Sequence, residues 1–103
     1  MSLYRPLTTE EIDTALASLE GWRHEDDALV RGVEVPAESQ PALREAVGNE
    51  AKVLEHQAEM RQDGKGVEIR LQTHDAGGVT AKDVELAARI DQVLSGAARD
   101  RAS

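Results

Sequence analysis

The stretch VEIRLQTHDAGGVTAKDVELAARIDQ, residues 67–92, contains the clearest strand and the clearest helix of the chain, joined by a short loop. In its first five residues apolar and polar side chains alternate, which is typical of a strand with one buried face. The loop ends before Thr80 and Asp83, whose spacing is that of a helix capping box. Apolar residues then recur at helical spacing. We therefore expect a strand over 67–71 and a helix over 81–95.

The residues upstream predict two further helices and two further strands. Thr8 and Glu11 form a second capping-box pair, which is followed by an apolar stripe at helical spacing. In one expected strand Arg31 breaks the alternation of apolar residues, which suggests that this strand lies at a sheet edge. The polar run 55–62 is expected to be a solvated helix end, followed by a polar turn over 61–66. The upstream elements are a helix over 9–20, strands over 22–24 and 29–35, and a helix over 41–57.

These elements, in the order helix–strand–strand–helix–strand–helix, predict a two-layer α+β domain. Each helix is apolar on one side only, so we expect an antiparallel sheet covered on one face by three helices, with the other face open to a partner. The 103 residues suit a single domain, 1–103, with a core over about 7–95 and a flexible tail over 97–103. Only two aromatic residues are present, so the core is small, which favours oligomerisation.

The charge and composition of the chain argue against several classes of function. Twenty acidic against twelve basic side chains give a net charge of −8, so we expect neither a nucleic-acid nor a membrane partner. The absence of cysteine excludes disulfides, thiol nucleophiles and thiolate metal sites. No apolar run approaches the roughly 20 residues of a membrane helix, and the first residues form no apolar signal region, so a cytoplasmic location is expected.

Three histidines are the candidates for proton transfer, because histidine exchanges protons near neutral pH. His24 lies in a polar hairpin and is expected to be an ordinary surface residue. His56 is expected at the C-terminal end of the helix over 41–57, where the helix dipole stabilises an imidazolium, and His74 follows the strand over 67–71. Ends of helices and strands present groups to ligands, so His56 and His74 could meet, although the residues alone favour surface or capping roles.

Other patterns give weaker signals. The potential ligands His56, Glu59, His74 and Asp75 have neither zinc-protease nor di-iron spacing, so no metal is expected. The pair Gly77-Gly78 before a helix could cradle an anion, but a tight turn is the simpler interpretation. Nothing in the residues therefore requires a cofactor.

The stretch Leu71–Gln92 resembles the C-terminal half of the pterin-4a-carbinolamine dehydratase family. The shared pattern is an alternating strand that ends in Thr-His-Asp, a Gly-Gly turn, a Thr-x-x-Asp helix start and then Leu-Ala-x-x-Ile-Asp. Upstream the resemblance continues through Leu7, the TTEE helix start, Gly21-Trp22, Leu29 with Arg31, and a helix end over Ala51–His56. It covers about residues 7–94 without large gaps, and it implies the element order given above.

The resemblance implies site residues position by position. In the family's signature Lys52 takes the leading charged position, His56 is the first histidine, His74 is the third and Asp83 is the closing aspartate. Thr73 and Asp75 flank His74 as the family's loop residues do.

Three positions depart from the signature. Gln57 stands for the second histidine, Ala58 for a proline and Gly64 for an aromatic residue. The chain is therefore identified as a divergent member with an altered His-His-Pro signature.

The family implies dehydration of a 4a-hydroxytetrahydropterin to the quinonoid dihydropterin, a step in tetrahydrobiopterin recycling. His56 and His74 would divide the acid and base roles, with Asp83 or Asp75 orienting an imidazole. The substrate would be contacted by Lys52, Gln57, Thr73 and Asp75. No metal or redox cofactor is implied, the partner is a reduced pterin, and homodimers or homotetramers through the sheet are expected. The alternative is a catalytically impaired, dehydratase-like binding or assembly protein with a protein partner.

Overall fold

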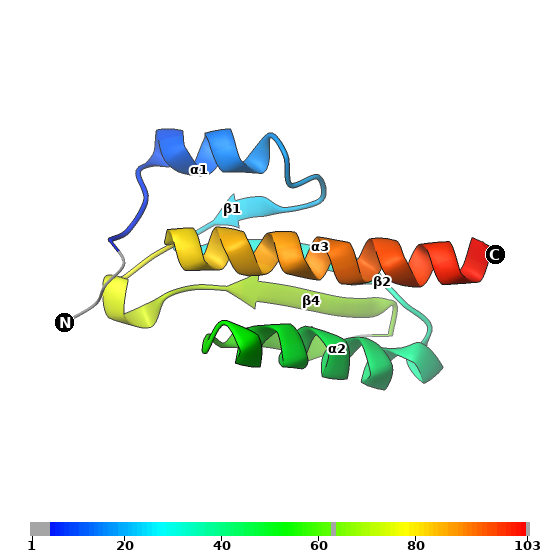
Figure 1. Cartoon of the computed structure of the whole chain (residues 1–103). Helices are drawn as coiled ribbons and strands as arrows, with labels where there is room; N and C mark the ends of the chain where they lie inside the picture. Colours follow the sequence, from blue (N-terminus) through cyan, green and yellow to red (C-terminus); the bar gives the residue numbers. More distant parts are fainter. Residues whose placement is uncertain (1–4, 63, 103) are drawn as a thin grey trace.

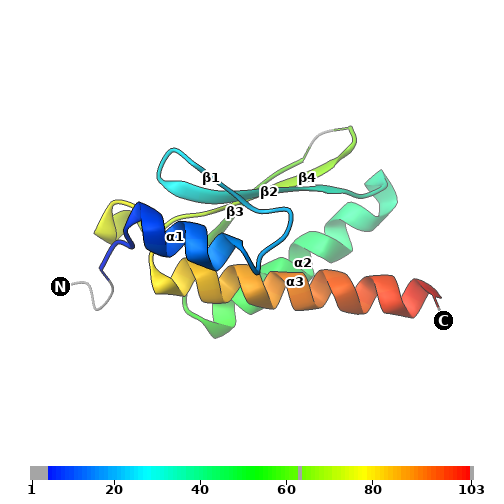
Figure 2. The ribbon, with the colours of Figure 1, turned by 90° about the horizontal axis from the view of Figure 1, so that it is seen from above.

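The computed structural model describes residues 5–62 and 64–102, and for 96–102 only the backbone. Three helices cover one face of a four-stranded antiparallel sheet, so the molecule has two layers and the predicted fold class is confirmed (Figures 1 and 2). The strand order is β1-β2-β4-β3. The helices are α1 (Thr9–Leu16), α2 (Gln40–Val53) and α3 (Ala81–Ala102), and the strands are β1 (Arg23–Glu25), β2 (Ala28–Glu34), β3 (Ala58–Gln62) and β4 (Gly66–Leu71).

The core lies between the sheet and the helices, and its residues follow the strand and helix periodicities of the sequence. Leu29, Ile69 and Leu71 point from β2 and β4 toward the helix layer, where Leu86 and Ile90 of α3 pack against them, and all five are fully buried. Burying such side chains stabilises the fold by about 1.5–3 kcal/mol each. The central pair of strands and α3 therefore form the rigid part of the scaffold.

The first helix begins as predicted and ends earlier. The Thr8 hydroxyl accepts from the Glu11 backbone N–H at 3.1 Å, and the Glu11 carboxylate accepts from the Thr8 N–H at 3.0 Å. Arg5 lies 2.7 Å from the same carboxylate, and its hydrogen bond is the main cause that lowers the pKa of Glu11 to about 2. After Leu16 the chain continues in tight turns that bring Leu19 into the core, so α1 does not extend to residue 20.

The largest error of the sequence prediction is the missing strand β3. The segment 55–62 was expected to be a helix end, but Ala58–Gln62 pair with β4 as the edge strand of the sheet. Ala58 and Met60 are half-buried against the core and alternate with the exposed Glu59 and Arg61. The prediction failed because this strand is short and charged, as edge strands often are, so its period-2 signal was weak. The element order thus contains one strand more than expected, and α3 runs past residue 95.

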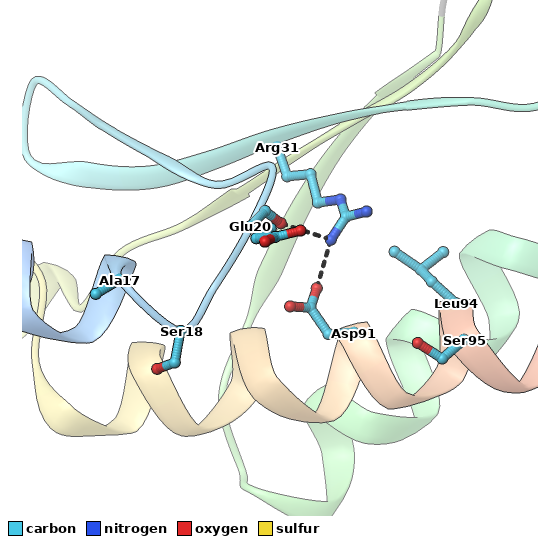
Figure 3. Close-up of a pocket in the computed structure, with 7 residues that line it drawn as sticks. All are labelled: Ala17, Ser18, Glu20, Arg31, Asp91, Leu94 and Ser95. Atoms are coloured by element: carbon cyan, nitrogen blue, oxygen red, sulfur yellow. Dashed lines mark hydrogen bonds and ion pairs between the residues drawn. The ribbon is translucent and has the colours of Figure 1, made fainter.

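Arg31 does not lie at a sheet edge, because β2 is an interior strand. Its side chain points to the helix layer, where its guanidinium lies 2.6 Å from Asp91 of α3 and 3.2 Å from the Glu20 carbonyl oxygen (Figure 3). The same Asp91 oxygen accepts from the indole N–H of Trp22 at 2.8 Å. A charged residue is tolerated on this face because Asp91 neutralises it. Asp91 therefore joins α3 to β2 and to the start of β1.

Replacing Asp91 by alanine is expected to lower the free energy of unfolding by about 2 kcal/mol, since two half-buried donors lose their acceptor. Urea denaturation followed by circular dichroism measures this loss, and Asp13→Ala on the exposed face of α1 serves as the control. Equal midpoints for the two variants would show that solvent replaces the Asp91 contacts without loss of stability.

Candidate active site

The C-terminal end of α2 positions the first candidate residue. The helix ends at Val53, before the predicted end at Gln57. The His56 N–H donates to the Ala51 carbonyl at 2.9 Å and the Glu55 N–H donates to the Lys52 carbonyl at 3.0 Å, which is the Schellman pattern of helix termination. In this motif glycine usually takes the left-handed position, but here Glu55 occupies it with φ +52°. His56 therefore follows a sharp turn and leads into β3 rather than continuing the helix.

His56 and Asp83 form the buried centre of the site. The Nε2 atom of His56 makes a short hydrogen bond with Oδ1 of Asp83, and the two side chains are 10% and 0% exposed. The other carboxylate oxygen, Oδ2, accepts from the Thr73 hydroxyl at 2.8 Å and from the Thr80 backbone N–H at 2.9 Å. A fully buried carboxylate needs such donors, because desolvation penalises an unpaired charge. Both carboxylate oxygens of Asp83 therefore have hydrogen-bond donors, and the side chain is fixed in place.

The hydrogen bonds also define which nitrogen of His56 can react. A carboxylate oxygen only accepts, so Nε2 carries the proton in the bond to Asp83. In the neutral imidazole Nδ1 then holds the lone pair, and this atom is the one available to a ligand. The Thr80 hydroxyl lies 2.8 Å from the Thr73 hydroxyl and extends the network by one step.

Asp83 also caps helix α3. Of the two hydrogen bonds of the predicted capping box, one is present: the Asp83 carboxylate accepts from the Thr80 N–H at 2.9 Å. The Thr80 hydroxyl contacts the Thr73 hydroxyl instead. The same side chain thus stabilises a helix start and holds an imidazole, so the rigid α3 scaffold determines where His56 lies.

A pocket of about 180 Å³ opens next to this network. His74 lies in the short 3₁₀ helix η2 (His74–Ala76) that follows β4, and its Nε2 is 3.7 Å from the Glu59 carboxylate. Both of these side chains are well exposed, at 65% and 60%. The pocket is lined by Glu55, His56, Gln57, Gln72, Thr73, His74 and Asp75. Two histidines that lie 18 positions apart in the chain thus border one hollow.

Five of the seven residues predicted for the site line the pocket, and two do not. His56, Gln57, Thr73, His74 and Asp75 all line the pocket. Asp83 lies behind His56, outside the lining. Lys52 is exposed on the last turn of α2 and is not a lining residue. Gly64, where the family has an aromatic residue, lies in the turn between β3 and β4 and contributes nothing to the wall.

The other described hollows contain no histidine. One of about 470 Å³ surrounds the Arg31–Asp91 ion pair (Figure 3), and one of about 630 Å³ lies along β2, α2 and α3 with mostly apolar walls. Both hollows are larger than the histidine pocket, but neither is lined by a pair of histidines that could act as acid and base. In the part of the chain that the structure describes, no group of three metal-ligand side chains is placed to hold an ion, and no helix is long and apolar enough to cross a membrane.

Two features of the site were missed by the sequence analysis. Glu55 lines the pocket and has a left-handed backbone conformation. The sequence does not predict this conformation, because glycine or asparagine is the usual residue at such a position. Glu59 was considered only as a metal ligand, and it lies beside His74 because β3 brings it there. The alternation of Ala58 and Met60 with Glu59 and Arg61 was the one sequence signal that could have placed Glu59 in a strand.

The comparisons with known proteins show which family the chain resembles over most of its length. The family model described as "Pterin 4 alpha carbinolamine dehydratase" matches residues 5–93. Relatives named "Putative pterin-4-alpha-carbinolamine dehydratase" are 37% identical over 90 residues in Mycobacterium sp. (strain KMS), covering 85% of this chain and 95% of that protein. The relative of the same name in Opitutus terrae is 40% identical over 94 residues, covering 84% of this chain and 92% of that protein.

A solved structure has the same fold. It is described as a transcriptional coactivator/pterin dehydratase from Brucella melitensis, and it aligns with a TM-score of 0.80 at 26% identity, over 86% of this chain and 98% of that one. The family model matches nearly the whole described chain, and the sequence relatives and the shared architecture agree with that match. The chain belongs to the pterin-4a-carbinolamine dehydratase family.

Proposed function

We propose that this protein dehydrates a 4a-hydroxytetrahydropterin to the quinonoid dihydropterin, as a step in the recycling of a tetrahydropterin. The observation that carries the proposal is the buried His56–Asp83 pair at the wall of a pocket that His74 also lines. A carboxylate that fixes the tautomer and orientation of an imidazole is a recurrent arrangement for general-base catalysis. Family membership supplies the substrate class.

In the proposed reaction Nδ1 of His56 removes the N–H proton of the pterin. The electron pair of that bond forms the C=N double bond while the C4a–O bond breaks, and His74 donates a proton to the departing hydroxyl, which leaves as water. The Glu59 carboxylate lies 3.7 Å from Nε2 of His74. Proton transfer by such positioned groups contributes roughly 10²–10⁴-fold to a rate.

Gln57 replaces a histidine of the family signature and lines the same pocket. Its amide donates and accepts hydrogen bonds but exchanges no proton at neutral pH, so we assign it to substrate binding. Thr73 and Asp75 are proposed to contact the ligand as well. The pocket volume of about 180 Å³ is below the roughly 300–1,000 Å³ of enclosed ligand sites, so the pterin would lie partly in solvent.

Stopped-flow decay of a 4a-hydroxytetrahydropterin should accelerate in the presence of the protein, and His74→Ala should slow the catalysed decay by about 10²-fold, because the hydroxyl then leaves without an acid. His24→Ala, an exposed position on β1, is the control and should behave as wild type. Wild-type decay equal to that in buffer would eliminate the enzymatic function.

A second candidate is a binding or assembly protein that retains the fold without turnover. It is favoured by the three departures from the signature, at Gln57, Ala58 and Gly64, and the related Brucella structure is described as a coactivator as well as a dehydratase. A stable complex isolated from native lysate, combined with inactivity in the decay assay, would support this candidate over the first.

The proposed assembly is a homodimer or homotetramer that forms through the sheet. The face of the sheet opposite the helices carries side chains of both signs, among them Arg23 and Glu68, which lie 3.7 Å apart. Such mixed charge permits self-association of a chain with a net charge of −8, and light scattering measures the subunit number. Cytoplasmic location stays a prediction.

A further inference from the structure

Thr80 directly precedes helix α3, but its hydroxyl is turned away from the helix it would cap. In a capping box the hydroxyl of the first residue accepts the backbone N–H three positions later. Here the Asp83 N–H donates to the Thr80 carbonyl at 3.0 Å, while the Thr80 hydroxyl lies 2.8 Å from the Thr73 hydroxyl. Thr80 is fully buried and does not line the histidine pocket. Its hydroxyl therefore acts on Thr73 rather than on the helix or on a ligand.

The direction of each hydrogen bond in this group follows from a count of protons. The Asp83 carboxylate only accepts, so the one proton of the Thr73 hydroxyl lies in the 2.8 Å bond to Oδ2 of Asp83. Thr73 then has no second proton to offer, so the Thr80 hydroxyl donates to the Thr73 oxygen. The protons thus point one way, from Thr80 through Thr73 to Asp83. Nε2 of His56 donates to the other oxygen of the same carboxylate.

The bond from Thr80 fixes the direction in which the Thr73 hydroxyl points. Thr73 is half-buried and also lines the histidine pocket, so a second environment is open to its hydroxyl. Rotation about the Cα–Cβ bond moves a threonine hydroxyl among three staggered positions. Donation by Thr80 favours the position that faces Asp83, and it polarises the Thr73 O–H into a stronger donor. Oδ2 of Asp83 is thereby kept occupied, and Oδ1 is left facing His56.

We propose that Thr80 is a positioning residue of the active site. Its buried hydroxyl holds the Thr73 hydroxyl on Asp83, and so fixes the carboxylate that orients His56. The loop backbone supports this arrangement, because Thr73 and Gly78 exchange N–H···O bonds of 3.0 and 3.3 Å that close the loop and bring Thr80 beside Thr73. The expected effect on rate rests on the proposed dehydratase function, whereas the arrangement of the protons does not.

Neutron diffraction from the deuterated wild-type protein tests the arrangement without any substitution. Deuterium is expected on the Thr80 hydroxyl, pointing at the Thr73 oxygen, and on the Thr73 hydroxyl, pointing at Asp83. Deuterium on Thr73 that points at Thr80 would overturn the proposal, because Thr80 would then draw the Thr73 donor away from Asp83.

Thr80→Val keeps the shape of the side chain and removes the donor. In the stopped-flow decay assay it should lower kcat about 5-fold with little change in KM, since the pocket lining is intact while the base is less well oriented. Thr80→Ser, which keeps the hydroxyl, should restore most of the rate. The matched control is Thr14→Val on the exposed face of α1, where the hydroxyl donates to the Glu10 carbonyl at 2.9 Å. This control should retain wild-type kinetics.

The proton NMR resonance of the His56 Nε2–H separates positioning from stability. It should move upfield in Thr80→Val, because a carboxylate that is held less firmly makes a longer hydrogen bond to the imidazole. It should return to the wild-type position in Thr80→Ser. Asp91→Ala also removes hydrogen bonds inside the fold, so it should lower Tm and leave this resonance in place.

Each outcome supports or overturns the proposal. An unchanged resonance in folded Thr80→Val, or equal losses of rate in Thr80→Ser and Thr80→Val, would show that Thr80 only stabilises the fold. If Thr80→Val does not fold, the deuterium positions in wild type decide. Wild type that fails to accelerate decay overturns the proposed function, while the deuterium positions and the resonance still decide whether Thr80 positions Asp83.

Discussion

Asp83→Asn is expected to reduce kcat by at least about 10²-fold and to lower the free energy of unfolding by about 3 kcal/mol. The carboxylate is fully buried, and each of its oxygens accepts from a different side: Oδ1 from His56, and Oδ2 from Thr73 and Thr80. An asparagine has one oxygen, so its NH₂ group must face either the His56 N–H or the two donors on the other side. Either orientation brings two donors together at a fully buried position.

The two effects are measured separately. Chemical denaturation gives the loss of stability, and stopped-flow decay below the unfolding transition gives the loss of rate. Thr73→Val, which removes one of the three donors to Asp83, should show a smaller destabilisation. Wild-type stability and rate in Asp83→Asn would mean that the carboxylate neither supports α3 nor orients His56.

His56→Gln is expected to lower kcat by about 10²–10⁴-fold with a small change in Tm. The glutamine amide can still donate a hydrogen bond toward Asp83, so the buried carboxylate keeps a partner, but no group is left to accept the pterin proton. The variant should therefore lose most of the catalysed rate while its fold stays intact.

Stopped-flow rate measurements test this assignment, and His24→Gln on β1 provides the matched substitution outside the site. A His56→Gln variant that keeps the wild-type rate would assign the base to another residue, for which His74 is the first candidate.

The sequence determined the architecture because local patterns and tertiary contacts agree over most of the chain. The alternation of 67–71 reappears as β4 with its apolar residues fully or almost fully buried, and the stripe after Thr80 reappears as the core face of α3. Arg31 was predicted to lie at a sheet edge, although it pairs with Asp91 inside the fold. A charge on the core side of a strand is interpretable only when its partner, 60 positions away, is known.

The site could be predicted as a set of residues but not as an arrangement. The motif around His56, His74 and Asp83 indicated the residue types that acid–base chemistry needs. That Asp83, rather than Asp75, holds His56 depends on how the end of α2 packs against the start of α3, 27 positions later. Short-range periodicity contains no information about that approach, since it is determined by how the helices pack on the sheet.

The sequence by itself determined the two-layer fold, the helix starts and the group of side chains able to exchange protons, because each depends on residues within a few positions of one another. The tertiary structure alone decided that β3 joins the sheet edge, that Glu55 takes the left-handed turn and that Asp83 fixes the tautomer of His56. These features arise from contacts between distant segments, whose stability depends on burial and on pairing of polar groups away from water.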